Sequence, residues 1–315
     1  MSVFLFYLFL ALILSFYLSG SQLKPFLGFN GFLPGNNIGV IEFLTKHKKF
    51  SKKYGNLPDK YEHYNCFVRS RITDDRAMLY YDFPILGRSI ASLHLTLYPY
   101  HVSAQVDSFG MPMRYIDVSK DGFSVKPGFG LQELLNHSRG WTINNSVTEV
   151  SYSFLASQFD SLSAKVAYEI YCHLVRLDAD GYVNRVQAVL NFVQFLPYGI
   201  PNFDTDEWYY HELSLPPESF VLSYGDCDSK SLFFASIMKH LIPARNIVII
   251  VCKVKAFADM DYTAHAMVGI SGLSISGESV TIKNVNYLIL ETTAPIHIGE
   301  KSWEKIDVVS VHELQ

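Results

Sequence analysis

Residues 216–250 read PPESFVLSYGDCDSKSLFFASIMKHLIPARNIVII, and our prediction of the fold starts from this stretch. The tripeptide GDC, which ends at Cys227, precedes an apolar run with helical spacing and predicts a helix that begins at the cysteine. The stripe expected to face inward is Cys227, Ser231, Phe234, Ala235, Met238 and Leu241. Pro243 ends this helix because proline has no backbone N–H to donate, and residues 246–255 then predict a strand.

A cysteine in the first turn of a helix has chemical consequences. The positive end of the helix dipole favours the thiolate over the thiol, and the thiolate is the nucleophilic form. Gly225 allows a tight turn that leaves the sulfur accessible, and Asp226 can cap the helix. The carboxylates of Asp226 and Asp228 oppose the dipole, because like charge raises the pKa of the Cys227 thiol between them. A nearby imidazolium must therefore supply much of the activation.

Two later strand-like segments carry side chains that can complete such a site. His265 lies in TAHAMVGI, and Glu291 follows the apolar part of VNYLILETT. If the two strands are adjacent and antiparallel, the two side chains need only share one face near the same end. His265 would then accept the thiol proton, and Glu291 would hold its second ring N–H. The backbone N–H of Cys227 would serve as one oxyanion donor.

Each of these residues also has a structural reading. A single cysteine on the inner stripe of a helix is commonly a core residue, and a lone histidine in a strand commonly makes structural hydrogen bonds. A glutamate at a strand end is commonly a surface residue. The spacing of Cys227, His265 and Glu291 along the chain does not decide between these readings.

The stretch at 216–250 resembles the nucleophile segment of the transglutaminase-like superfamily, and in particular its bacterial cysteine-proteinase branch. That branch shows a pattern close to P-x-E-[ST]-[LF]-x(4)-G-D-C-D-[DS]-K-[AS]. NFVQFLPYGIPNF is similar to a helix end of the family, AHAMVGI to its histidine strand and YLILETT to its acid strand. The resemblance covers residues 183–293. It implies a papain-like fold with Cys227 as the nucleophile, His265 as the base and Glu291 as the orienting acid.

Two further points concern this resemblance. The acid of the family is more often an aspartate, whereas this chain has Glu291 followed by two threonines, and the longer carboxylate can still reach an imidazole. Related thiol enzymes use a side-chain N–H as the second oxyanion donor, and the resemblance implies Gln194 for this role. The alternative is a surface glutamine at a helix end.

The remainder of the chain predicts an α+β organisation. Apolar residues recur at helical spacing from 147 to 196, ahead of the nucleophile helix and the antiparallel strands. Strand-like runs at 76–83 and 92–106, broken by turns, predict a mixed or β-rich N-terminal region. The expected divisions are a signal peptide or anchor at 1–22, an accessory region at 23–146 and a transglutaminase-like catalytic domain at 147–315.

An unbroken apolar run, VFLFYLFLALILSFYL, extends from Val3 to Leu18. Its length fits the apolar core of a signal peptide or a short membrane anchor. We expect an exported chain, periplasmic or extracellular, or one tethered to the membrane by residues 3–18. The lysine-rich stretch at 46–54 is expected to be a solvated helix face, with contact to an anionic polymer or headgroup as the alternative.

Composition and motifs argue against several classes of protein. The net charge of −4 lacks the basic excess of nucleic-acid-binding proteins, so no nucleic-acid partner is expected. The cysteines are Cys66, Cys172, Cys227 and Cys252. They form no disulfide scaffold if one is the nucleophile, and Cys172 and Cys252 are expected as small buried core residues. No C-x-x-C or H-E-x-x-H motif is present, so we expect no metal and no cofactor.

Together these features predict a cysteine-dependent acyl-transfer enzyme that acts on peptide or protein amide bonds through a thioester acyl-enzyme. Water as the acceptor, as in a protease or amidase, is preferred over an amine, as in a transglutaminase. The alternatives are a catalytically inactive transglutaminase-like binding module and an envelope assembly factor. The substrate and the oligomeric state are left open.

Overall fold

The computed structural model describes residues 68–72, 76–98, 109–119, 122–130, 140–144, 147–200, 206–222, 224–257 and 259–314. The apolar segment at residues 3–18, the lysine-rich stretch at 46–54 and Cys66 lie outside the described residues. Within the described ranges, no helix is both long and apolar enough to cross a membrane.

The helical part of the chain lies where the apolar spacing predicts it. The helices are α6 (Tyr152–Gln158), α7 (Asp160–Arg176), α8 (Tyr182–Phe195), α9 (Pro216–Leu222) and α10 (Cys227–Met238). In α7 the buried apolar residues Val166, Ile170 and Leu174 follow one another at four-residue steps, so one face of the helix packs inward. A short 3-10 turn, η3 (Ala244–Asn246), follows Pro243 and leads into the next strand.

Helix α10 is the central element of the fold. Every residue from Ser229 to Met238 is buried, so the helix is covered on all sides and not only along the stripe that the sequence predicts. It packs against α6, α7, α8 and α9, and against two strands of the main sheet, β10 (Ile247–Lys255) and β11 (Thr263–Ser271). The position of α10 is therefore fixed by four helices and two strands of the main sheet.

The main sheet has the strand order β12-β13-β11-β10-β14, and all its pairs are antiparallel. Its other strands are β12 (Ser279–Ile282), β13 (Val285–Leu290) and β14 (Lys305–Glu313). Strand β11 lies between β10 and β13, with Cys252 opposite His265 and Leu290 opposite Val268. This register brings the end of β13 close to the histidine. The mixture of helices with an antiparallel sheet agrees with the α+β prediction, while a papain-like core stays a prediction.

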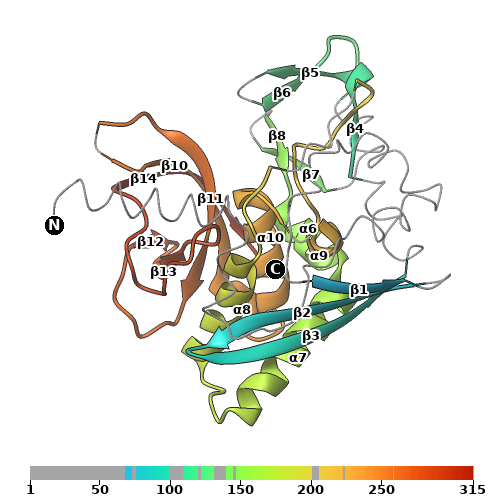
Figure 1. The fold of residues 1–315 in the computed structure, drawn as a ribbon. Helices are drawn as coiled ribbons and strands as arrows, with labels where there is room; N and C mark the ends of the chain where they lie inside the picture. Colours follow the sequence, from blue (N-terminus) through green and yellow to red (C-terminus); the bar gives the residue numbers. More distant parts are fainter. Residues whose placement is uncertain are drawn as a thin grey trace.

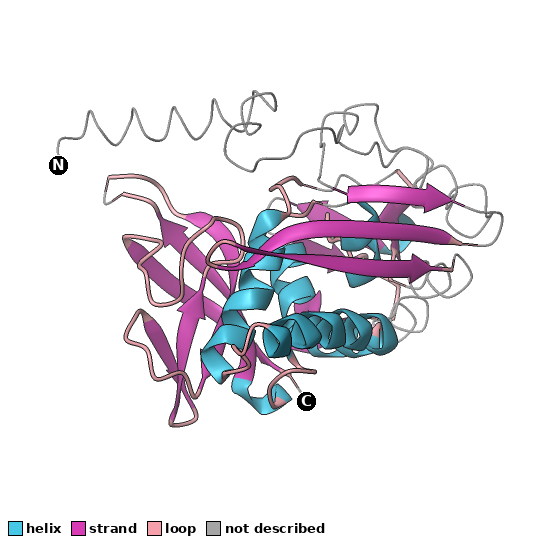
Figure 2. Cartoon of the chain, turned by 60° about the horizontal axis from the view of Figure 1, so that its bottom comes forward, coloured by secondary structure: helices cyan, strands magenta, loops and turns pink. Residues whose placement is uncertain are grey.

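A second sheet consists of β1 (Val68–Ile72), β2 (Ala77–Leu86) and β3 (Ser89–Leu97). Gly87 has a φ of +54°, a backbone conformation suited to glycine, and it makes the turn between β2 and β3. Phe83 of β2 packs on Phe192 of α8 with ring centroids 4.8 Å apart. The hairpin thus shares one hydrophobic core with α8 and α10. Figures 1 and 2 show the helices between this sheet and the main sheet.

Three small strand pairs complete the described structure at one end of the molecule (Figure 1). They are β4 (Met111–Pro112) with β9 (Trp208–Tyr209), β5 (Ile116–Ser119) with β6 (Gly122–Val125), and β7 (Trp141–Asn144) with β8 (Val147–Val150). A 3-10 turn, η2 (Met113–Tyr115), separates β4 from β5. Strand-like structure in this part of the chain agrees with the prediction of a mixed or β-rich region.

Candidate active site

Cys227 is the first residue of α10, as the sequence predicts. The preceding residue Asp226 has an extended backbone, and its carboxylate caps the helix by accepting the Ser229 backbone N–H at 2.9 Å. Gly225 is held by two backbone hydrogen bonds, from its own N–H to the Pro197 carbonyl and from the N–H of Gly199 to its carbonyl. The helix start and its cysteine are thereby fixed against the end of α8.

His265 and Glu291 form a direct buried pair. The ring nitrogen Nε2 of His265 lies 2.9 Å from Oε2 of Glu291, and their side chains are 9% and 2% exposed. His265 stands on β11, and Glu291 directly follows β13, the neighbouring strand. The structure therefore brings together the two side chains that the sequence places on adjacent antiparallel strands.

The Glu291 carboxylate is surrounded by donors. Its Oε1 accepts the backbone N–H of Thr293 at 2.7 Å and the Thr293 hydroxyl at 2.5 Å. Its Oε2 accepts the indole N–H of Trp303 at 2.9 Å, in addition to His265. Burial alone would raise the pKa of Glu291, but the bonds and charge of His265 and the bonds of Thr293 outweigh burial and lower the pKa to about 2. The carboxylate is therefore ionised throughout the neutral range.

Trp303 is a residue that the sequence analysis missed. Its indole donates to Glu291, and its ring packs edge-on against the His265 ring with centroids 5.0 Å apart. It lies in the loop ahead of β14, outside any motif that the sequence offers. A lone tryptophan in a polar loop was the available signal, because an indole N–H that becomes buried requires an acceptor.

Gln194 takes a different place from the one expected. Its amide nitrogen donates to the carbonyl oxygens of Glu291, at 2.8 Å, and Ile296, at 2.9 Å. Both amide protons are thus used on the backbone, and no donor is left for an oxyanion. This corrects the assignment of Gln194 as the second oxyanion donor: the residue is a buried link between α8 and the segment that carries the acid.

A second link joins α10 to the same segment. The hydroxyls of Ser231 and Thr292 lie 3.1 Å apart, and both residues are fully buried. Ser231 is one helical turn beyond Cys227, and Thr292 follows Glu291. This hydrogen bond consequently fixes the position of Glu291 relative to the start of α10.

The Cys227 sulfur lies beside the histidine strand but is not bonded to the imidazole. The backbone N–H of Ala266, the neighbour of His265, acts on the sulfur and lowers the pKa of the thiol. Within the described residues the thiol donates to the Asp228 carboxylate, with 3.7 Å between Sγ and Oδ1. Since Nε2 of His265 is used by Glu291, the ring nitrogen left to face a thiol proton is Nδ1.

Burial and two neighbouring acids dominate the electrostatics of the thiol. Burial, followed by the charges of Asp228 and Asp226, raises the pKa of Cys227 far above its ordinary value. These effects outweigh the backbone N–H groups of the helix start, which favour the thiolate. The acids also act on each other: burial and the Asp228 charge raise the pKa of Asp226 to about 7. The like-charge effect that the sequence predicts is therefore present.

Asp228 has its own polar surroundings. The buried hydroxyl of Tyr152 hydrogen-bonds to its carboxylate, and burial together with the Asp228 charge raises the pKa of this tyrosine well above its usual value. On the other side, His211 Nε2 lies 3.8 Å from Asp228 Oδ2, and the Tyr209 hydroxyl bonds the second nitrogen of His211 at 2.7 Å. These contacts hold the carboxylate beside the thiol.

The remaining cysteines differ in their burial. Cys252 is 1% exposed and contacts the backbone of His265, as expected for a core residue. Cys172 is only partly buried, which corrects the expectation of a core position on α7. Both are free thiols, as is Cys227. No group of three or more potential metal-ligating side chains occurs in the described part of the chain.

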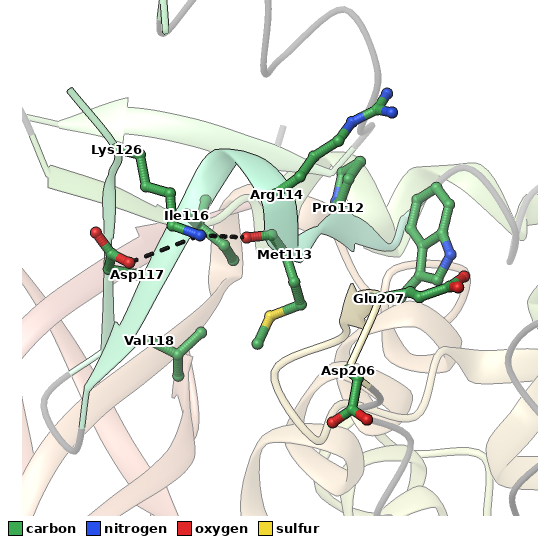
Figure 3. Close-up of a pocket in the computed structure, with 10 residues that line it drawn as sticks. Pro112, Met113, Arg114, Ile116, Asp117, Val118, Lys126, Asp206 and Glu207 are labelled. Atoms are coloured by element: carbon green, nitrogen blue, oxygen red, sulfur yellow. Dashed lines mark hydrogen bonds and ion pairs between the residues drawn. The ribbon is translucent and has the colours of Figure 1, made fainter. Parts of the chain in front are cut away.

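A separate hollow of about 730 Å³ lies along β4, η2, β5 and β9 (Figure 3). Its wall includes the apolar side chains of Met113, Val118 and Trp208 and the acidic side chains of Asp206 and Glu207. None of the residues around the Cys227 thiol lines it. The chemistry described above is thus located at the start of α10 and not in this hollow.

A scan against protein-family models and a search of curated proteins gave no match for this chain. Among solved structures, the chain is similar to EGTA-treated LapG from Legionella pneumophila, at 13% sequence identity and a TM-score of 0.30. The similarity covers 52% of this chain and 82% of LapG. It is a distant structural relationship.

Proposed function

We propose that this chain is a cysteine-dependent acyl-transfer enzyme that acts on peptide or protein amide bonds. The observation that carries the proposal is the buried His265–Glu291 pair, which lies beside the helix start that presents Cys227. A nucleophile next to a base that is oriented by a third group is the arrangement that covalent catalysis requires. In this proposal Cys227 is the nucleophile, His265 the base and Glu291 the orienting acid.

The first half of the reaction follows from these positions. Glu291 holds the N–H at Nε2 of His265, so Nδ1 carries a lone pair and accepts the thiol proton of Cys227. The sulfur attacks the amide carbonyl carbon, the C=O electrons move to oxygen, and the Cys227 backbone N–H donates to the resulting oxyanion. The oxyanion collapses to a thioester, the C–N bond breaks, and the imidazolium gives its proton to the leaving amine.

The second half releases the acyl group. His265 removes a proton from a water molecule, the oxygen attacks the thioester, and the sulfur leaves and regains a proton from the imidazolium. We prefer water to an amine as the acceptor, and the leader at residues 3–18 favours substrates outside the cytoplasm. The chain would then be exported or tethered, and would hydrolyse peptide bonds of proteins in that compartment.

The raised thiol pKa favours one alternative, a non-catalytic binding module that retains the fold. Among the described residues the thiol donates to Asp228 and not to His265, and burial with two carboxylates disfavours the thiolate. A cysteine that remains a neutral thiol in every state would be inert. Chemical reactivity separates this alternative from the enzyme.

The test is alkylation by iodoacetamide at pH 7, with each cysteine followed by peptide mass spectrometry. For an enzyme we expect Cys227 to react at least about tenfold faster than Cys66, Cys172 and Cys252, and His265→Ala to abolish this advantage. His94→Ala, which changes an exposed histidine on β3, is the matched control and should react like the wild type. Equal slow labelling of all four cysteines would contradict the proposal and favour the binding module.

A further inference from the structure

The proposed reaction lacks one hydrogen-bond donor. An oxyanion is normally held by two donors, and the backbone N–H of Cys227 supplies one. Gln194 cannot supply the second, because its amide protons are bonded to the carbonyls of Glu291 and Ile296. A second donor must come from another side chain near the sulfur.

The backbone position of Tyr198 suits a second oxyanion donor. It forms a parallel β-bridge with Gly225, two residues before Cys227. Residues paired in a bridge direct their side chains to the same face, and so do residues two apart in an extended chain. Because Asp226 is extended, Tyr198 and Cys227 leave their backbones on a common face of this bridge.

The surroundings of the Tyr198 ring agree with this placement. Burial, followed by the charges of Cys227, Asp226, Asp228 and Glu291, raises the pKa of Tyr198 to about 12. Its hydroxyl is therefore a proton donor across the whole range from weakly acid to weakly basic pH. This hydroxyl has no hydrogen-bond partner among the residues that the structure describes, and Tyr198 is 46% exposed, so a substrate can reach it.

We propose that Tyr198 is a catalytic residue whose hydroxyl donates a hydrogen bond to the oxyanion formed when Cys227 attacks a carbonyl. This inference rests on the proposed function, because it assigns a donor to that reaction. The bond strengthens as negative charge develops on the carbonyl oxygen, so it stabilises the transition state more than the bound substrate. Loss of the hydroxyl should lower kcat and leave KM nearly unchanged.

Two reactions of the same thiol separate this role from others. Alkylation by iodoacetamide forms no oxyanion, whereas acylation by p-nitrophenyl acetate passes through one. In Tyr198→Phe we expect the alkylation rate of Cys227 to stay within about twofold of the wild type. The acylation rate should fall about 100-fold, the usual effect of removing one oxyanion donor. Tyr168→Phe, which removes the hydroxyl of a 67% exposed tyrosine on α7, is the matched control and should change neither rate.

The outcomes are distinct. An unchanged acylation rate in Tyr198→Phe overturns the inference, and so does an equal fall in both rates, because the hydroxyl would then act on the thiol itself. A rise in KM at constant kcat assigns Tyr198 to substrate binding and also overturns it. If wild-type Cys227 shows neither fast alkylation nor acylation, the proposed function fails first, and the assignment of an oxyanion donor fails with it.

Discussion

The two sides of the Cys227 sulfur differ in how their charges are balanced. On the strand side, the Glu291 carboxylate accepts bonds from His265, Thr293 and Trp303, and its pKa falls to about 2. On the helix side, Asp226 and Asp228 face the same thiol and raise its pKa, and the pKa of Asp226 itself rises to about 7. The strand side stabilises the negative charge of Glu291, whereas the helix side disfavours a negative charge on the Cys227 thiol.

In the proposed mechanism, this difference indicates which group has to activate the Cys227 thiol. A helix start favours a thiolate, but burial and two carboxylates outweigh the few backbone N–H groups that point to the sulfur. Charge separation must therefore rely on the imidazole, whose positive form is stabilised by the ionised Glu291. Substitutions on each side should act in opposite directions, and three of them test this contrast.

Glu291→Gln should have the largest effect, because it removes the only charge in the described strand-side group that stabilises the imidazolium. We expect the rate of p-nitrophenyl acetate hydrolysis to fall about 10⁴-fold, as when the orienting acid of a Ser-His-Asp triad is replaced by its amide. Glu278→Gln, at a partly buried glutamate away from the thiol, is the control. A rate within tenfold of the wild type would show that Glu291 does not orient the base.

The same variant tests the pKa of Glu291. Its folded pKa, about 2, lies below the ordinary value of 4.5, so the ionised carboxylate stabilises the fold above about pH 4.5. This contribution is lost as the pH falls from 4.5 towards 2. Thermal unfolding should therefore show that the wild type loses more stability than Glu291→Gln between pH 5 and pH 3. Parallel losses would contradict the lowered pKa.

Asp228→Asn should have an effect of the opposite sign and of intermediate size. It removes one negative charge beside the thiol but keeps an oxygen that can accept from Tyr152, so the pKa of Cys227 should fall. We expect alkylation of Cys227 by iodoacetamide at pH 7 to become about tenfold faster. Asp117→Asn, at an exposed carboxylate on β5, should leave the rate unchanged. A slower reaction would show that the carboxylate assists the thiol.

Trp303→Phe should have the smallest effect. It removes the indole N–H that donates to Glu291 but keeps an aromatic ring against His265, and the bonds from His265 and Thr293 remain. We expect kcat for p-nitrophenyl acetate to fall about fivefold with KM unchanged, since one of several bonds to the carboxylate is lost. A shift in the pH profile of Cys227 alkylation should accompany the change. An unaltered profile would assign Trp303 to packing alone.

Local sequence patterns predicted a large part of the site. The GDC motif ahead of an apolar run with helical spacing predicted a helix that starts at Cys227, and the structure has this start. Alternating and apolar runs predicted the strands that carry His265 and precede Glu291. These predictions succeed because caps, proline stops and side-chain periodicity act over a few residues of the chain.

Partners that come from distant parts of the chain could not be predicted in this way. Gln194 was expected at an oxyanion, yet it bonds carbonyls about 100 residues further along the chain. Trp303 carries no pattern that would relate it to Glu291. Periodicity indicates which face of an element is buried, but not which atom on another element meets it there.

The amino-acid order alone was sufficient to place a cysteine at a helix start, to surround it with acids and to set a histidine and a glutamate on strands. Folding in three dimensions determined that the glutamate became a low-pKa partner of the histidine while the thiol became a weak acid. The physical reason is that the pKa of a buried group depends on how far it is removed from water and on how many hydrogen-bond donors surround it. Both depend on every element that packs around the group. A pattern along one segment contains neither quantity.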